Sequence, residues 1–211
     1  MSNRFVIGGG WSVSQFAEQL DDLTSLGHVI GVNDAAIHAH VHEALTMDRL
    51  WFEHRWPKLR ELRVPKVWVR EKCDCNVPRK TAADNWLTFK HLNKIDPSVT
   101  PRELHGGNSG TCAINLALQQ MTSGDNLFLL GFDMCRGPGN EPYWYPPYPW
   151  TAPEGATKPG HFKRWVDELG GFARYAQVKQ LNIYNVSLRS RIELWPKLRF
   201  DQMMEMISYG P

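Results

Sequence analysis

The sequence predicts an α/β protein with a mainly parallel, Rossmann-like sheet and helices on both of its faces. The chain opens with an apolar run, a glycine turn, a helical pattern and a second apolar run over 2–32. A second unit of turn, helix and buried strand follows over 106–130. Because strand-like and helix-like segments alternate in this way, the sheet is expected to be parallel.

Length and composition fit a single domain over 1–211. With 211 residues, of which 42% are hydrophobic, the chain can form one substantial core. The net charge of +2 gives no reason to expect nucleic acid or an anionic membrane as a partner. No apolar run reaches the roughly 18 residues that span a bilayer, so we expect a cytoplasmic protein without a membrane span.

The first third of the chain is expected to hold four strands. Phe16, Leu20 and Leu23 have helical spacing, and Gly27 is typical of a helix end. The expected elements are strand 2–7, helix 12–26, strand 28–32, short helix 35–45, strand 49–52, helix 56–62 and strand 64–69. The segment 71–103 is polar and shows no clear period.

The remainder is expected to hold two more strands and an insert. A turn over 106–110 precedes a helix over 111–121 and a buried strand over 126–130. Residues 136–160 contain seven prolines with tyrosines and tryptophans between them. Proline at this density excludes a helix interior or a central strand, so the segment is expected to be an ordered loop or a lid. A helix over 161–177 and a strand over 181–186 complete the pattern.

The glycine turn after the first strand is the first candidate binding site. Glycine at Gly8, Gly9 and Gly10 allows close approach to a phosphate and a positive φ. Ser12 can cap the following helix, whose free N–H groups attract anions. The pattern is not the G-x-G-x-x-G of dinucleotide sites, and many such turns merely join a strand to a helix.

Polar residues also stand where other strands end, which is where ligands bind on parallel α/β sheets. Asn33 and Asp34 follow the second strand. Asn108, Ser109 and Gly110 precede a helix as a second anion cradle or as an ordinary N-cap. Asp133 follows the expected strand 126–130. An acid at this place can bind a ribose hydroxyl or a metal, or cap a loop.

The aromatic segment and the helix after it add further candidates. The hydroxyl groups of Tyr143 and Tyr145 can contact phosphate, and their rings can stack on a base or sugar. His161 begins a helix, and histidine is the usual general base near neutral pH. The alternatives are a surface histidine and a loop that docks another protein.

Cysteine and histidine spacing does not favour a metal site. Cys73 and Cys75 are spaced C-x-C, which is not the C-x-x-C of zinc sites. His38, His40 and His42 alternate and would share a face on a strand, where a two-ligand clip is conceivable. A polar face near a loop is the favoured interpretation, and no metal ligand is assigned.

The order of these motifs resembles a superfamily that joins small bacterial sialyltransferases, motility-associated glycosyltransferases, archaeal hydroxymethyldihydropterin pyrophosphokinases and many phage proteins. Its members share a G-x-G-x-S turn, here Gly8 to Ser12, and an asparagine after strand two, here Asn33. They also share an S-G before a helix, a strand ending in G-x-D and a closing N-x-S-x-x-S. These are Ser109-Gly110, Gly131-Phe132-Asp133 and Asn185 to Ser190. Trp11 departs from the proline that the family usually has.

The resemblance implies a site for a cytidine nucleotide. The glycine turn and Asn33 would lie near phosphate and ribose, and Ser109-Gly110 near base or ribose. Tyr143 or Tyr145 would contact phosphate, and His161, in the G-H-x-K context of Gly160 to Lys163, would act as base. The phage branch is closest in motif, which implies the host cytoplasm as location.

Three functional hypotheses follow. The leading one is a glycosyltransferase-like enzyme that uses a nucleotide-sugar donor of CMP or UDP type. Its acceptor is a glycan or a modified phage DNA base, and a homo-oligomer stays possible. The second is Mg²⁺-dependent pyrophosphoryl or phosphoryl transfer, in which Asp34, Asp48 or Asp133 would matter. The third is a non-catalytic protein that binds a nucleotide or a phage partner.

Overall fold

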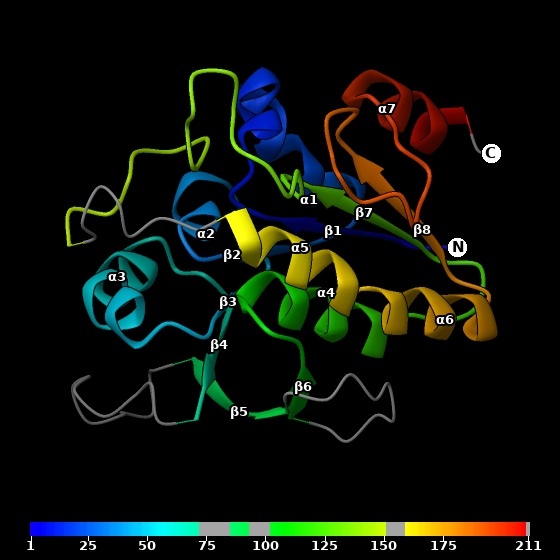
Figure 1. The fold of residues 1–211 in the computed structure, drawn as a ribbon. Helices are drawn as coiled ribbons and strands as arrows, with labels where there is room; N and C mark the ends of the chain where they lie inside the picture. The colour runs from blue at the N-terminus through cyan, green and yellow to red at the C-terminus, as the bar shows by residue number, and fades with distance from the viewer. Residues whose placement is uncertain (72–84, 93–101, 151–158, 210–211) are drawn as a thin grey trace.

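The structure, a computed structural model, describes residues 1–71, 85–92, 102–150 and 159–209. Within these ranges, eight strands form one sheet in which every pairing is parallel (Figure 1). The strands are β1 (Asn3–Ile7), β2 (His28–Val32), β3 (Glu43–Thr46), β4 (Lys66–Arg70), β5 (Trp86–Leu92), β6 (Glu103–His105), β7 (Asn126–Leu130) and β8 (Asn182–Val186). The predicted parallel α/β sheet is therefore confirmed.

The strand order places a change of direction at β1. The order is β6-β5-β4-β3-β2-β1-β7-β8, so the chain adds β2 to β6 on one side of β1 and then β7 and β8 on the other. Ile7 of β1 pairs with Gly31 of β2 and with Leu130 of β7. Such a reversal leaves a crevice beyond the carboxyl ends of the strands, where ligands of open α/β sheets bind.

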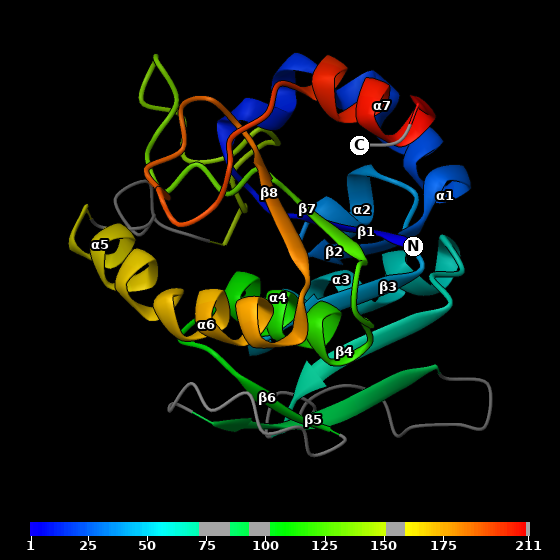
Figure 2. The same cartoon turned by 90° about the vertical axis from the view of Figure 1, so that its right-hand side faces the viewer.

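Helices cover both faces of the sheet. Because side chains alternate along a strand, Phe5 and Ile7 pack into one core and Val6 into the other. The first core is covered by the 3₁₀ helices η1 (Trp11–Gln15) and η2 (Ala17–Asp22), with α1 (Leu23–Leu26), α2 (Ala35–His38), α3 (Arg49–Glu61) and α7 (Phe200–Tyr209). The second core is covered by α4 (Ser109–Gln119), α5 (Pro159–Glu168) and α6 (Gly170–Lys179), as Figure 2 shows for α4 and α6.

The continuous helix expected over 12–26 is wrong, because η1, η2 and α1 take its place. Phe16, with φ −144° and ψ 22°, leaves the helical region and separates η1 from η2. Its ring stacks on Phe200 of α7 with centroids 4.4 Å apart, so a sequence-distant element packs at the break. Gly27 does end α1, but with extended backbone; glycine is needed there because a Cβ would lie 2.2 Å from the carbonyl oxygen of Asn3.

The elements expected between 35 and 62 are also corrected. The short helix ends at His38, and the third strand is Glu43–Thr46 instead of 49–52. Residues 49–52 form the first turn of α3, which Asp48 caps by accepting a hydrogen bond from the backbone N–H of Trp51 at 3.2 Å. The apolar residues that resembled a strand are spaced to bury one side of this helix; they are Trp51, Phe52, Trp56 and Leu59.

Three elements had no counterpart in the prediction. β5 and β6 lie within the polar segment 71–103 or at its end, and most of β5 is only partly buried, so no apolar run marks it. α7 follows the last expected strand. The helix expected over 161–177 is two helices, α5 and α6, that meet at Leu169.

No helix within the described ranges combines the length and apolar character that crossing a membrane requires.

A buried carboxylate ties the amino ends of three neighbouring strands together. Glu43 of β3 is 3% exposed and accepts hydrogen bonds from Trp68 and Lys66 of β4, and its carboxylate lies 3.1 Å from Nε2 of His28 on β2. Burial by itself raises the pKa of Glu43, but the hydrogen bonds of His28 and Trp68 outweigh burial and lower the pKa from 4.5 to about 2. Glu43 is therefore ionised at neutral pH.

Candidate functional site

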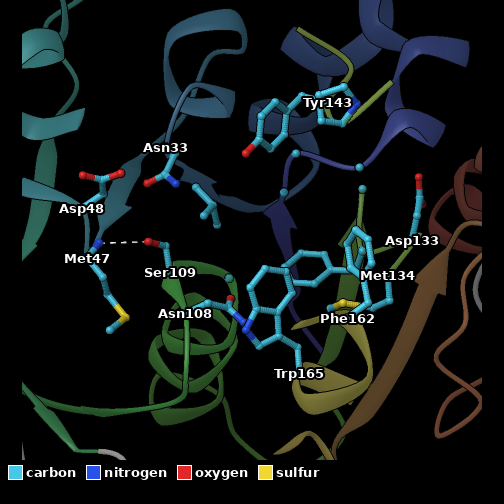
Figure 3. A pocket seen from close by; sticks show the side chains of 18 of the residues that line it. Asn33, Met47, Asp48, Asn108, Ser109, Asp133, Met134, Tyr143, Phe162 and Trp165 are labelled. Atoms are coloured by element: carbon cyan, nitrogen blue, oxygen red, sulfur yellow. Dashed lines mark hydrogen bonds between the residues drawn. The ribbon is translucent and has the colours of Figure 1, made fainter. Parts of the chain in front are cut away.

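A cavity of about 400 Å³ lies beyond the carboxyl ends of the central strands. Its walls come from the turns after β1, β2, β3 and β7, from the start of α4 and from α5 (Figure 3). Most of the site residues predicted from the sequence line it. These are Gly8, Gly9, Gly10, Asn33, Asn108, Ser109, Gly110, Asp133, Tyr143 and Tyr145. Ser12, Asp34 and His161 do not.

Other parts of the chain pack directly against the glycine turn and leave no room for side chains there. A Cβ at Gly10 would lie 2.6 Å from the carbonyl oxygen of Gly131, and one at Gly9 would lie 2.9 Å from the ring of Tyr143 and 2.9 Å from the hydroxyl oxygen of Tyr145. Gly8, Gly9 and Gly10 all have negative or extended φ, so the expected positive φ is wrong; Gly131, at φ 71°, takes that conformation instead. Close packing against the turn after β7 is what requires glycine here.

A carboxylate of the protein already binds the start of η1, the helix that follows the glycine turn. Asp133, which is 3% exposed, accepts a hydrogen bond from the backbone N–H of Ser12 at 2.8 Å and one from its hydroxyl at 2.6 Å. Ser12 is thus not the N-cap of η1; that position is Gly10, without a side-chain cap. Since a carboxylate already neutralises the positive end of η1, a phosphate at this point would meet like charge.

The start of α4 is organised differently. Asn108 and Thr111 form a capping box, in which Oδ1 of Asn108 accepts from the backbone N–H of Thr111 at 3.0 Å. Because Oδ1 is committed in this way, the Nδ2 of Asn108 has a fixed direction; it is buried and has no acceptor in the described chain. Ser109 accepts a hydrogen bond from the backbone N–H of Met47 at 2.9 Å, which joins α4 to the end of β3 (Figure 3).

Backbone N–H groups and two further side chains add hydrogen-bond donors to the cavity wall beside the start of α4. The first N–H groups of a helix lack intrahelical acceptors and carry the positive end of its dipole. Arg70, at the end of β4, lines the cavity and forms no ion pair with the described residues. The indole Nε1 of Trp165 is also buried without an acceptor in the described chain. Together with Asn108, these groups make one side of the cavity rich in donors.

The residues after β2 have separate roles. Asn33 lines the cavity in a left-handed conformation, φ 52°, and its Oδ1 is buried without a partner among the described residues. Asp34 points elsewhere, since its carboxylate pairs with Arg55 at 2.7 Å and accepts from Nε1 of Trp51 at 2.7 Å. Asp34 therefore holds α3 in place, and the carboxylate that reaches the cavity on this side is that of Asp48.

The described part of the proline-rich insert forms the aromatic wall of the cavity. Two hydrogen bonds of Trp144 hold this segment against the glycine turn. Its backbone N–H donates to the carbonyl oxygen of Gly9 at 3.1 Å, and its Nε1 donates to the carbonyl oxygen of Gly8 at 3.0 Å. Tyr143 and Tyr145 stack at 5.2 Å. Burial raises the pKa of Tyr145, and the neighbouring Tyr148 adds to this, so the hydroxyl of Tyr145 stays protonated and can act as a donor.

α5 reaches the cavity through different residues from the one predicted. Phe162 and Trp165 line it (Figure 3). His161 packs against Trp165 with ring centroids 5.9 Å apart and does not line it. Trp165 was missed because tryptophan on a helix is usually core. Its spacing of four residues from His161 places both on one side of α5. Glu168 of α5 accepts from the backbone N–H of Gly107 at 3.0 Å and ties this helix to the start of α4.

Among the described residues there is no group of three or more His, Cys, Asp or Glu that could hold a metal. His38 stacks on Tyr145 and His42 stacks on His28, so the alternating histidines serve different contacts. Cys73 and Cys75 lie outside the described residues.

No protein-family model matches this sequence, and no sequence among the curated proteins matches it. The fold, however, matches a solved structure, "Structure of MAf glycosyltransferase from Magnetospirillum magneticum AMB-1", with a TM-score of 0.62 and 13% sequence identity. The match covers 98% of this chain and 36% of that one, so this chain spans about a third of the length of its neighbour. The fold is thus a Rossmann-like fold that a glycosyltransferase also has.

Proposed function

We propose that this chain is a glycosyltransferase-like enzyme that binds a nucleotide-sugar of CMP or UDP type and transfers the sugar to an acceptor hydroxyl. Two findings support the proposal: the fold that the chain shares with a glycosyltransferase, and the donor-rich wall of a cavity at the switch point of the sheet. The observation that carries it is the unpaired, directionally fixed Nδ2 of Asn108 at the start of α4.

In this proposal the donor phosphate lies at the start of α4. Its N–H groups, the Nδ2 of Asn108 and the guanidinium of Arg70 supply hydrogen bonds and positive charge to phosphate oxygens. The glycine turn is the poorer place, because Asp133 already occupies the start of η1. Of the two helix starts that were predicted to hold phosphate, this proposal keeps the start of α4.

The opposite walls suit the uncharged parts of the donor. Oδ1 of Asn33 accepts hydrogen bonds, as a ribose or sugar hydroxyl requires. The ring of Tyr143 offers an aromatic surface, and Phe132 and Phe162 add apolar lining.

Transfer requires a base for the acceptor hydroxyl. The acceptor oxygen forms a bond to the anomeric carbon, the bond from that carbon to the phosphate oxygen breaks, and the nucleotide leaves with the electron pair. We assign the departing proton to Asp48, whose carboxylate lines the cavity while His161 does not.

Calorimetry with CMP, CDP, UMP, UDP, GDP and ADP tests the proposal. We expect a pyrimidine nucleotide to bind with a micromolar dissociation constant and with little dependence on Mg²⁺. Absence of binding by every nucleotide, with and without Mg²⁺, would overturn it. For the base, Asp48→Asn is expected to abolish sugar transfer or donor hydrolysis while nucleotide binding persists, and His161→Ala is expected to retain activity; the reverse outcome assigns the base to His161.

A second candidate is Mg²⁺-dependent pyrophosphoryl or phosphoryl transfer. Asp48 and Asp133 both line the cavity, and carboxylates are the groups that hold Mg²⁺ beside phosphates. Asp34 is paired with Arg55 and is withdrawn from this role. A rise in nucleotide affinity of tenfold or more with Mg²⁺, lost in Asp48→Asn, favours this function over sugar transfer.

A further inference from the structure

A second hollow, of about 460 Å³, lies next to the cavity at the same end of the sheet. It is formed by η1 and η2, by the residues that follow β8 and by the start of α7, which Figure 2 shows close to one another. The two spaces meet at one residue pair. Ser12 lines the hollow and Asp133 lines the cavity, and the hydrogen bonds between them form the partition.

One residue that lines this hollow has a buried hydroxyl without a partner among the described residues. Ser187, directly after β8, is 5% exposed, and its Oγ forms no hydrogen bond with the described residues. Burying a hydroxyl without a partner costs roughly 1–3 kcal/mol, so such a group is a candidate for ligand recognition. By contrast Ser190, three residues later, is fully bonded to Asn185 and to the carbonyl oxygen of Phe132.

The rest of the lining combines amides with aromatic and apolar surface. Gln15 and Gln19 are exposed on the wall formed by η1 and η2, and their side chains have no hydrogen bond with the described residues. The stacked rings of Phe16 and Phe200 lie on another side. Arg199 is paired with Asp201, and Arg189 lies over the ring of Trp11 at 5.3 Å from the ring centroid. Hydroxyl and amide groups beside apolar and aromatic surface are the chemistry that recognises the hydroxyls and C–H faces of a sugar.

We propose that this hollow is a carbohydrate-binding site, with Ser187 as a specificity-determining residue. It is a second site, separate from the donor cavity, because the buried Ser12–Asp133 pair lies between the two spaces. Ser187 donates to, or accepts from, a sugar hydroxyl, and Gln15 and Gln19 bind others.

Saturation-transfer NMR on the full chain tests the subsite with lactose, N-acetyllactosamine, maltose and chitobiose as probes. We expect at least one disaccharide to bind with a millimolar dissociation constant and to stay bound when a saturating nucleotide is added. Ser187→Ala is expected to weaken that binding about fivefold, the effect of one hydrogen bond. Because the hydroxyl has no partner, the same variant is expected to unfold at the urea concentration of the wild type or higher.

Ser208→Ala, an exposed serine on α7, is the matched control and is expected to bind as the wild type does. The subsite is overturned if none of the four sugars binds, if nucleotide displaces the bound sugar, or if Ser187→Ala binds it as tightly as the wild type. Calorimetry of the nucleotides on the same samples separates the two proposals. Sugar binding without nucleotide binding rejects the donor cavity and leaves the hollow as a lectin-like site, whereas nucleotide binding without sugar binding rejects the hollow alone.

Discussion

Asp133 and Ser12 are joined by two hydrogen bonds across 121 residues of chain, one to the backbone N–H of Ser12 and one to its hydroxyl. The pair links the turn after β7 to the start of η1 and gives η1 the negative partner that its amino end requires. It also separates the donor cavity from the hollow beside β8. An acid that the sequence suggested as a ligand contact therefore has an identifiable structural role.

Removal of this carboxylate is expected to destabilise the protein. Asp133→Ala leaves the N–H and hydroxyl of Ser12 buried without acceptors, a cost of about 2–4 kcal/mol in the free energy of unfolding. Ser12→Ala removes one donor only and is expected to cost about 1 kcal/mol. Urea denaturation of both variants measures the difference, and equal midpoints for Asp133→Ala and the wild type would show that the pair does not stabilise the fold.

Gly10 is expected to tolerate no side chain, for reasons of packing. A Cβ there would lie 2.6 Å from the carbonyl oxygen of Gly131 and 2.8 Å from the carboxylate of Asp133. Gly10→Ala is therefore expected to lower the free energy of unfolding by about 2–3 kcal/mol. Gly170→Ala is the control, since nothing lies within 4 Å of its Cβ position and alanine favours a helix. The expectation fails if thermal unfolding shows both variants equally stable.

Stability is expected to fall in acid because of Glu43. Its pKa is about 2 in the fold, below its ordinary 4.5, so its contribution is present above pH 4.5 and is lost as the pH falls toward 2. This shift corresponds to about 3 kcal/mol. In Glu43→Gln the pH dependence between 4.5 and 2 is expected to flatten, while Glu18→Gln, at an exposed position, keeps the wild-type profile. Parallel profiles for wild type and Glu43→Gln would contradict the role.

The central strands and the helix that reaches the cavity could be predicted from sequence, because local signals mark them. β2 and β7 were predicted with their observed bounds, and β1, β8 and α4 within two residues of theirs. All of them except β8 combine apolar residues with a neighbouring glycine or asparagine turn. β3 was missed because Glu43 interrupts its apolar pattern, and its burial depends on partners on β2 and β4.

The binding site was predictable as a location but not in its chemistry. A strand end indicated Asn33, a helix start indicated Asn108 and Ser109, and all three line one cavity. No local pattern indicates that Asp34 pairs with Arg55, or that Trp165 reaches the cavity while His161 does not. These outcomes depend on how α3 and α5 pack against the sheet, which arises from contacts between distant parts of the chain.

The most direct test of the account is nucleotide calorimetry on the wild type and Asn108→Asp. Aspartate caps a helix as well as asparagine does, so the bond to Thr111 and the stability are retained while the Nδ2 donor is lost and a negative charge faces the phosphate. The account predicts that the best-binding nucleotide loses at least tenfold in affinity with an unchanged unfolding temperature. Equal affinity in the two proteins would contradict a phosphate site at the start of α4.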